Sequence, residues 1–261
     1  MLDAIDRIGA QAITRVRNVG YGLGFMVEVF RQTGRFLTRR STGSRVLTMQ
    51  ILFTGVEALS VVATISLSIG AVIIIQGLSL LPQFGQGQLI YDILIIVITR
   101  ELGPILTALI VTARSGTAIA TELGNMVINH EVEAYTVTGI NPIQHIVVPR
   151  FIGVTLSTFL LNLYFNVFGL MGSYVVTQIV NPIALSEYSS GLLAALSMTD
   201  VAASVVKSLV FGAITALVAT FYGLRVERAS TEIPVAAIRS VSRGITLLIV
   251  ANAVITLAYY I

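Results

Sequence analysis

The chain has 261 residues, of which 55% are hydrophobic and 11% charged, and its formal net charge is +3. Soluble domains carry about 25% charged residues, so this composition indicates an integral membrane protein and leaves no length for a large soluble domain. The chain contains no cysteine, which excludes disulfides, thiol catalysis and cysteine-based metal sites.

Residues 2–23 predict an amphipathic helix. Apolar side chains recur there at steps of three and four residues, and Asp and Arg side chains fill the opposite face. Such a helix lies in the plane of the lipid headgroups, although a soluble helix packed on a partner has the same pattern. Residues 25–37 continue along the membrane surface in this interpretation. We therefore expect an N-terminal interfacial segment over 1–45 and a membrane domain over 46–261.

Five hydrophobic spans follow, each long enough to cross about 30 Å of hydrocarbon. They are predicted at about 51–81, 92–120, 146–180, 201–223 and 241–261. The segment before the first span contains eight Arg, whereas the loops near 82–91 and 181–200 contain no Lys or Arg. The positive-inside rule then places the N-terminus in the cytoplasm and the C-terminus on the outer side. The expected fold class is an all-α integral membrane protein.

Three charged residues fall inside these spans: Arg100 and Glu101 in the second and Lys207 in the fourth. A charge at membrane depth is costly unless it is paired or wetted. At about 1.5 Å per residue all three lie roughly 10 Å below the outer interface, so a pair between Glu101 and Lys207 is feasible. Neighbouring residues point in different directions on a helix, which leaves Arg100 facing a cavity or an anionic ligand. A salt bridge that only fixes helix packing is the alternative.

Small residues dominate the stretch 103–124, which predicts a tight helix–helix seam. Whether this seam forms within one chain or between chains is left open by the pattern. Pro104, directly after the charged pair, predicts a kink in the second span.

Residues 125–145 predict a short helix on the cytoplasmic side, between the second and third spans. Asn125 is a candidate N-cap, and Gly139, followed by Asn141 and Pro142, ends the helix. One face is apolar and the other acidic, which suits docking to a soluble subunit, although a helix lying on the membrane surface also fits. The residues expected to carry this coupling role are Met126, Ile128, His130, Glu131, Val132, Glu133 and Tyr135.

No motif predicts catalysis in this chain. His130 and His145 have no second ligand at metal spacing, so no metal site is expected. The sequence contains no Gly-rich phosphate loop, no Ser-His-Asp set and no basic-aromatic surface for nucleic acid. If the protein uses ATP, a separate chain must hydrolyse it, and no cofactor is expected here.

Five short motifs in fixed order resemble the MlaE family, the permease subunits of ABC-type lipid transporters that work with MCE-domain proteins. They are RELGP at 100–104, ARSG at 113–116, TELGNM at 121–126, GINP at 139–142 and VPR at 148–150. The resemblance extends more loosely to Gln76-Gly77, to Lys207-Ser208 and to Phe221-Tyr222-Gly223.

The resemblance implies a homodimer of five-span subunits in a bacterial inner membrane. It implies a cytoplasmic ABC ATPase dimer, using ATP and Mg²⁺, docked on the helix at 126–138. A hexameric ring of MCE-domain subunits would sit on the outer face, with a STAS-domain protein as a further possible partner. The implied cargo is phospholipid, moved between the inner membrane and the periplasmic MCE assembly in the service of outer-membrane lipid homeostasis. Its cavity at the dimer interface would be lined by Arg100, Glu101, Lys207 and Gln76.

The loop at 129–142 and the region 224–241 depart from the family pattern. We therefore expect the partner contacts of the 129–142 loop to differ in detail from those of the family. Two other classes of function remain open on the sequence alone. One is a stand-alone secondary transporter that uses Glu101 as a proton site. The other is a membrane scaffold that only anchors proteins on the outer face.

Overall fold

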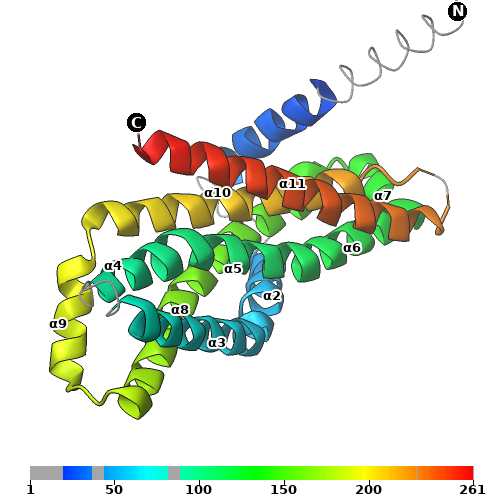
Figure 1. The fold of residues 1–261 in the computed structure, drawn as a ribbon. Helices are drawn as coiled ribbons and strands as arrows, with labels where there is room; N and C mark the ends of the chain where they lie inside the picture. Colours follow the sequence, from blue (N-terminus) through cyan, green and yellow to red (C-terminus); the bar gives the residue numbers. More distant parts are fainter. Residues whose placement is uncertain (1–19, 37–43, 82–88, 228, 261) are drawn as a thin grey trace, which may run out of the picture.

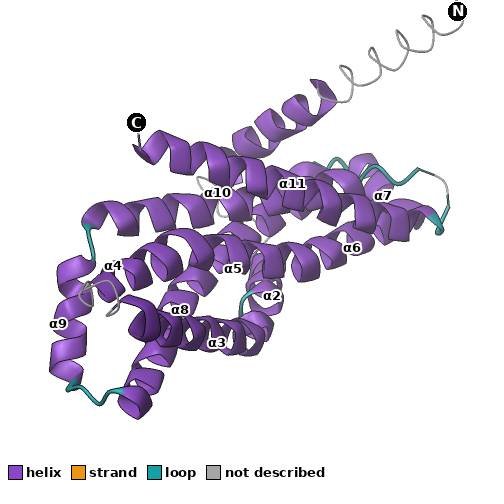
Figure 2. Cartoon of the chain, in the orientation of Figure 1, coloured by secondary structure: helices purple, strands orange, loops and turns teal. Residues whose placement is uncertain are grey.

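The computed structural model describes residues 20–36, 44–81, 89–227 and 229–260. Most of the helix predicted over 2–23, and most of the loop predicted near 82–91, lie outside these ranges. Within them all regular secondary structure is helical (Figure 2), which confirms the predicted all-α class. Five segments of the described chain are long and apolar enough to span a membrane: Arg45–Leu80, Ile90–Ile128, Ile143–Val180, Met198–Gly223 and Glu232–Tyr259.

The first of these segments is bent rather than straight. It consists of α2 (Ser44–Thr54), a turn of 3₁₀-helix η1 (Val56–Ala58) and α3 (Leu59–Leu80). Figure 1 shows α2 running across the direction of α3. The 22 residues of α3 alone are long enough to cross the hydrocarbon core, so α2 is available to lie at one end of the bundle.

The second segment alternates between α-helical and wider π-helical turns. Its parts are α4 (Ile90–Leu94), η4 (Ile95–Leu102), α5 (Gly103–Val111), η5 (Thr112–Gly116) and α6 (Thr117–Ile128). The π-helical stretch η4 ends directly before α5, which has Pro104 in its first turn, so the helical hydrogen-bonding pattern changes at this proline, and the predicted kink stays a prediction. Single π-type turns inside helices occur frequently at functional sites.

The third segment contains the central helix of the fold. It joins η6 (Ile143–Val147) to α8 (Val148–Val180), which packs on α2, α3, α5 and α10 (Met198–Gly223) (Figure 1). In contrast, α11 (Glu232–Tyr260) lies at the periphery: 11% of its most apolar window is buried, against 67% for the third segment. The small residues at 103–124 form their seam within the chain, where Thr112 and Thr215 share a hydrogen bond of 2.7 Å.

A short helix, α9 (Leu185–Ala195), connects the third and fourth segments. It is held to α8 by Tyr188, whose hydroxyl shares a hydrogen bond of 2.6 Å with Ser173 and also donates to the carbonyl of Leu170. Burial of this ring raises the pKa of the Tyr188 phenol above its usual 10.0, so the phenol stays neutral at physiological pH.

The short helix predicted between the second and third segments is α7 (Glu131–Val137). Asn125 is not its N-cap, which corrects the prediction, because α6 continues through Asn125 to Ile128. The break comes later, at His130, whose φ of 58° is left-handed and cannot continue a helix. Gly139, with φ of 78°, ends this region as predicted.

Candidate functional site

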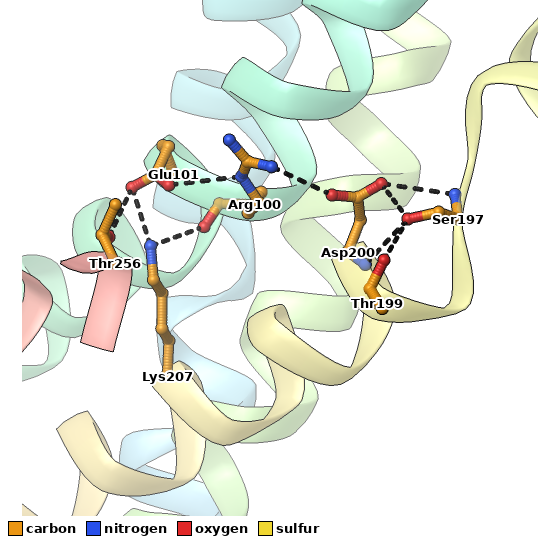
Figure 3. Close-up of polar contacts among 7 residues, drawn as sticks. All are labelled: Arg100, Glu101, Ser197, Thr199, Asp200, Lys207 and Thr256. Carbon is orange, nitrogen blue, oxygen red and sulfur yellow. Dashed lines mark hydrogen bonds and ion pairs between the residues drawn. The ribbon is translucent and has the colours of Figure 1, made fainter. Parts of the chain in front are cut away.

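The predicted pair between the second and fourth spans is present. Lys207 Nζ on α10 donates to Glu101 Oε2 on η4 at 2.7 Å, and it also donates to the carbonyl oxygen of Arg100 at 3.2 Å (Figure 3). Lys207 is only 1% exposed. Its charge is therefore compensated by two oxygens from the same turn of the neighbouring helix.

Pro104 removes the α-helical donor of that carbonyl. In an α-helix the carbonyl of Arg100 would accept from the N–H four residues later, but that position is Pro104, which has no N–H. A freed carbonyl inside a membrane must find another donor. Lys207 supplies it, so the Arg-Glu-Leu-Gly-Pro stretch and the lysine form one structural unit.

Arg100 has a partner on α10 that the sequence did not predict. It is 7% exposed, and its Nη1 lies 3.4 Å from Asp200 Oδ1 on α10. Its Nε lies 3.4 Å from Glu101 Oε1, so the neighbouring side chains converge after all. The wider turn of η4 and the length of both side chains allow this contact, which the geometry of a regular α-helix disfavours.

Asp200 has a second role at the start of α10. Its Oδ2 accepts hydrogen bonds from the backbone N–H and the hydroxyl of Ser197, while the Asp200 N–H donates to the Ser197 hydroxyl oxygen. This reciprocal arrangement is a capping box. The helix cap and the ion network therefore share one carboxylate, as Figure 3 shows.

The last turns of α11 cover the network from another side. Thr256 Oγ1 donates to Glu101 Oε2 at 3.4 Å, and the guanidinium carbon of Arg100 lies 4.9 Å from the centre of the Tyr259 ring. The side chain of Glu101 is 28% exposed and that of Arg100 is 9% exposed. Glu101 is thus the more accessible residue of this neighbouring pair.

Sequence reasoning missed Asp200, Thr256 and Tyr259. One signal was readable: Asp200 precedes Lys207 by seven residues, which is two helical turns and the same face of a helix. The contacts from α11 had no such signal, because the rotation of one helix against another depends on packing. Gln76, the fourth predicted lining residue, lies on α3, and its side chain is exposed. Its backbone carbonyl accepts a hydrogen bond from the Ser79 hydroxyl of the same helix.

Replacing Ser197 by alanine tests whether the Asp200 carboxylate serves both the helix cap and the ion network. The variant should lose about 1 kcal/mol of stability, the usual cost of an N-cap. Asp200→Ala keeps the backbone N–H that donates to Ser197, but it removes the reciprocal half of the capping box together with one partner of Arg100, so we expect a larger loss. Thermal unfolding of the two variants in detergent measures the difference; equal losses would contradict a role for Asp200 in the ion network.

The residues predicted for coupling divide into two groups. Met126, Val132 and Tyr135 pack against the main hydrophobic core, and Ile128 packs against a smaller cluster formed by the loop after α10 and the first turns of α11. His130, Glu131 and Glu133 are exposed, and His130 Nδ1 lies 2.9 Å from Glu133 Oε2. The predicted apolar stripe is therefore bound within the chain, and the outward side of α7 is left exposed.

Five apolar spans around a buried network of two cations and two anions define a multi-pass membrane protein with a polar centre among its spans. A family model described as Permease MlaE matches residues 47–258, and the chain therefore belongs to the MlaE permease family.

Several named relatives agree with this assignment. A probable ABC transporter permease protein of Rickettsia typhi is 30% identical over 79% of this chain and 80% of its own length. The intermembrane phospholipid transport system permease protein MlaE of Haemophilus influenzae is 28% identical over 67% of this chain and 66% of its own. The chloroplastic protein TRIGALACTOSYLDIACYLGLYCEROL 1 of Arabidopsis thaliana is 29% identical over 67% of this chain and 50% of its own.

Proposed function

We propose that this chain is the membrane permease subunit of an ATP-driven ABC transporter that moves phospholipid between the inner membrane and a periplasmic MCE-protein assembly. The observation that carries the proposal is the ion network at Arg100 and Glu101, within a family whose named relatives include a phospholipid transport permease. The physiological result would be lipid homeostasis of the outer membrane. The chain itself is not an enzyme in this proposal.

The network is suited to a lipid phosphate. Charge-assisted hydrogen bonds are about 2.7–2.9 Å long, whereas both ion contacts of Arg100 measure 3.4 Å. These two contacts are longer than optimal, which suits an exchange of Asp200 or Glu101 for a phosphate at the guanidinium. Lys207 holds Glu101 in place during that exchange.

The partners follow from the proposed activity. Two copies of the chain would form a homodimer. A cytoplasmic ABC ATPase dimer would use ATP and Mg²⁺, and an MCE-domain hexamer would bind on the periplasmic side, with a STAS-domain protein as an optional subunit. The arginine distribution supports a cytoplasmic N-terminus and a periplasmic C-terminus.

The surface that would contact the ATPase is the outward side of α7. Besides His130 and Glu133, it includes Val137, which is 87% exposed. A large apolar side chain this exposed beside charged residues is suited to the apolar centre of a partner interface.

Replacing Val137 by aspartate should weaken binding of the ATPase at least tenfold without unfolding the permease, because the side chain makes little contact within the chain. The measurement is the amount of ATPase that co-purifies with the tagged permease. Leu193→Asp on α9 is the matched control, since Leu193 is also exposed (71%) but lies at the other end of the fold. Full ATPase recovery with Val137→Asp would contradict docking on α7.

A further inference from the structure

An ion pair of a buried arginine and an exposed glutamate lies where α2, α6 and α8 meet, far from the network at Arg100. Arg150 Nη2 donates to Glu122 Oε1 at 2.6 Å, and Arg150 Nη1 donates to the carbonyl of Ile146 at 3.0 Å. Arg150 is 6% exposed, and its Nε has no hydrogen-bond partner among the described residues. Leaving a buried charged donor unpaired is costly, so this guanidinium retains the capacity to bind a further acceptor.

Two cavities flank this pair, and their charges differ. A cavity of about 370 Å³ is lined by Glu122, Arg150 and also Glu131, which gives its charged lining a formal charge of −1. A cavity of about 520 Å³ is lined by the same pair and by Arg45, which gives +1. Only the second cavity is suited to an anion, and its volume lies within the range of about 300–1,000 Å³ typical of small-molecule sites.

The lining of the larger cavity changes from charged to apolar side chains along α2. Arg45, Met49 and Phe53 follow one another at steps of four residues, so they share one face of this helix. Met49 is 62% exposed, and Ile119 of α6 lines the opposite wall. A cationic end followed by an apolar wall matches a lipid, with a phosphate at one end and an acyl chain at the other.

We propose that this cavity binds the phosphate headgroup of an anionic phospholipid, with Arg45 and Arg150 at the phosphate and the acyl chain along Met49 and Phe53. Glu122 lies about 30 Å along the second span from Glu101, from 21 residues of helical rise, so this site is separate from the cargo site at Arg100. Its assignment to the cytoplasmic leaflet rests on the orientation given under the proposed function.

The absence of tryptophan from the chain allows a direct test. Phe53→Trp places a single indole in the cavity wall of the full-length protein, reconstituted in nanodiscs of phosphatidylcholine. Brominated phosphatidylglycerol, added at a low mole fraction, should quench this indole more than brominated phosphatidylcholine at the same fraction. Met49→Trp gives a second reporter if the first variant does not fold.

Arg45→Gln should lower the preference for the anionic lipid about fivefold, the contribution of one basic side chain near a membrane surface. Arg150→Lys should lower it as well, because the ammonium lacks both Nε and the planar fork. Arg239→Gln is the matched control: it removes the same charge from an exposed position on α11 and should leave the preference unchanged.

Equal quenching by the two brominated lipids would overturn the proposal. A loss of preference in Arg239→Gln as large as that in Arg45→Gln would overturn it as well. Relief of quenching by inorganic phosphate would show a site for free anions and would overturn the assignment to lipid. The assay needs neither ATP nor a partner protein, so its failure is distinguishable from a failure of the proposed transport function.

Discussion

Glu101→Gln is expected to destabilise the protein by about 3–5 kcal/mol, the usual cost of removing one partner from a buried ion pair. A neutral amide would replace the carboxylate, which leaves Lys207, 1% exposed, without a negatively charged partner at Glu101 and with Arg100 as a second cation nearby. Lys207→Met should cost less, because Glu101 is partly exposed and keeps its contacts with Arg100 and Thr256. Unfolding midpoints of both variants in the same detergent test this order.

The double variant Glu101→Gln/Lys207→Met separates structure from transport. Replacing both partners removes the uncompensated charge, so stability should return close to that of the parent protein. Lipid transfer should remain impaired, because Arg100 loses one of its two described carboxylate partners, Glu101, and keeps Asp200 on α10. A stable double variant with normal transfer would reduce the pair to a packing role, the alternative left open by the sequence.

Gly70→Ala is expected to cost about 3 kcal/mol, near the upper end of typical overpacking penalties. A Cβ at Gly70 on α3 would overlap the carbonyl oxygen of Gly169 on α8, and one at Gly172 would overlap the carbonyl of Leu67. The two helix backbones are in direct contact here, and a backbone carbonyl cannot rotate away as a side chain can. The helices would have to separate, which loses packing along the whole seam.

Gly116→Ala provides the matched control for this substitution. Its Cβ would meet side-chain carbons of Thr112 and Thr215 at 3.8 Å, which is ordinary contact. The control should therefore unfold within a few degrees of the parent protein in a thermal scan. A Gly70→Ala variant with the same unfolding midpoint as Gly116→Ala would show that the backbones of α3 and α8 are not in direct contact at Gly70.

The membrane spans could be predicted because apolar length is a local property of the sequence. The bounds of these spans were predicted less accurately. The second helix continues beyond residue 120 through Glu122 and Asn125, although the apolar run has ended. Packing of α6 against α10 and α11 supports these polar turns, and no local pattern carries that information. The fifth helix likewise begins at Glu232, well before the apolar run at 241.

The candidate site could also be predicted only in part. Equal depth in two spans was enough to pair Glu101 with Lys207, because few partners satisfy a charge at that depth. Asp200 was missed because it lies at the first turn of α10, where a carboxylate is normally explained by capping alone. The pair of Glu122 and Arg150 was missed because its residues belong to helices whose relative position only the folded chain defines.

Affinity purification of the tagged chain from its native host in gentle detergent, with mass spectrometry of the bound proteins and lipids, tests the central claim most directly. We expect an ABC ATPase and an MCE-domain protein in stable ratio with the permease, together with bound phospholipid. Recovery of the chain alone, under conditions that preserve other ABC complexes, would contradict the account and favour a secondary transporter. An outer-face protein recovered without ATPase or lipid would instead favour a scaffold.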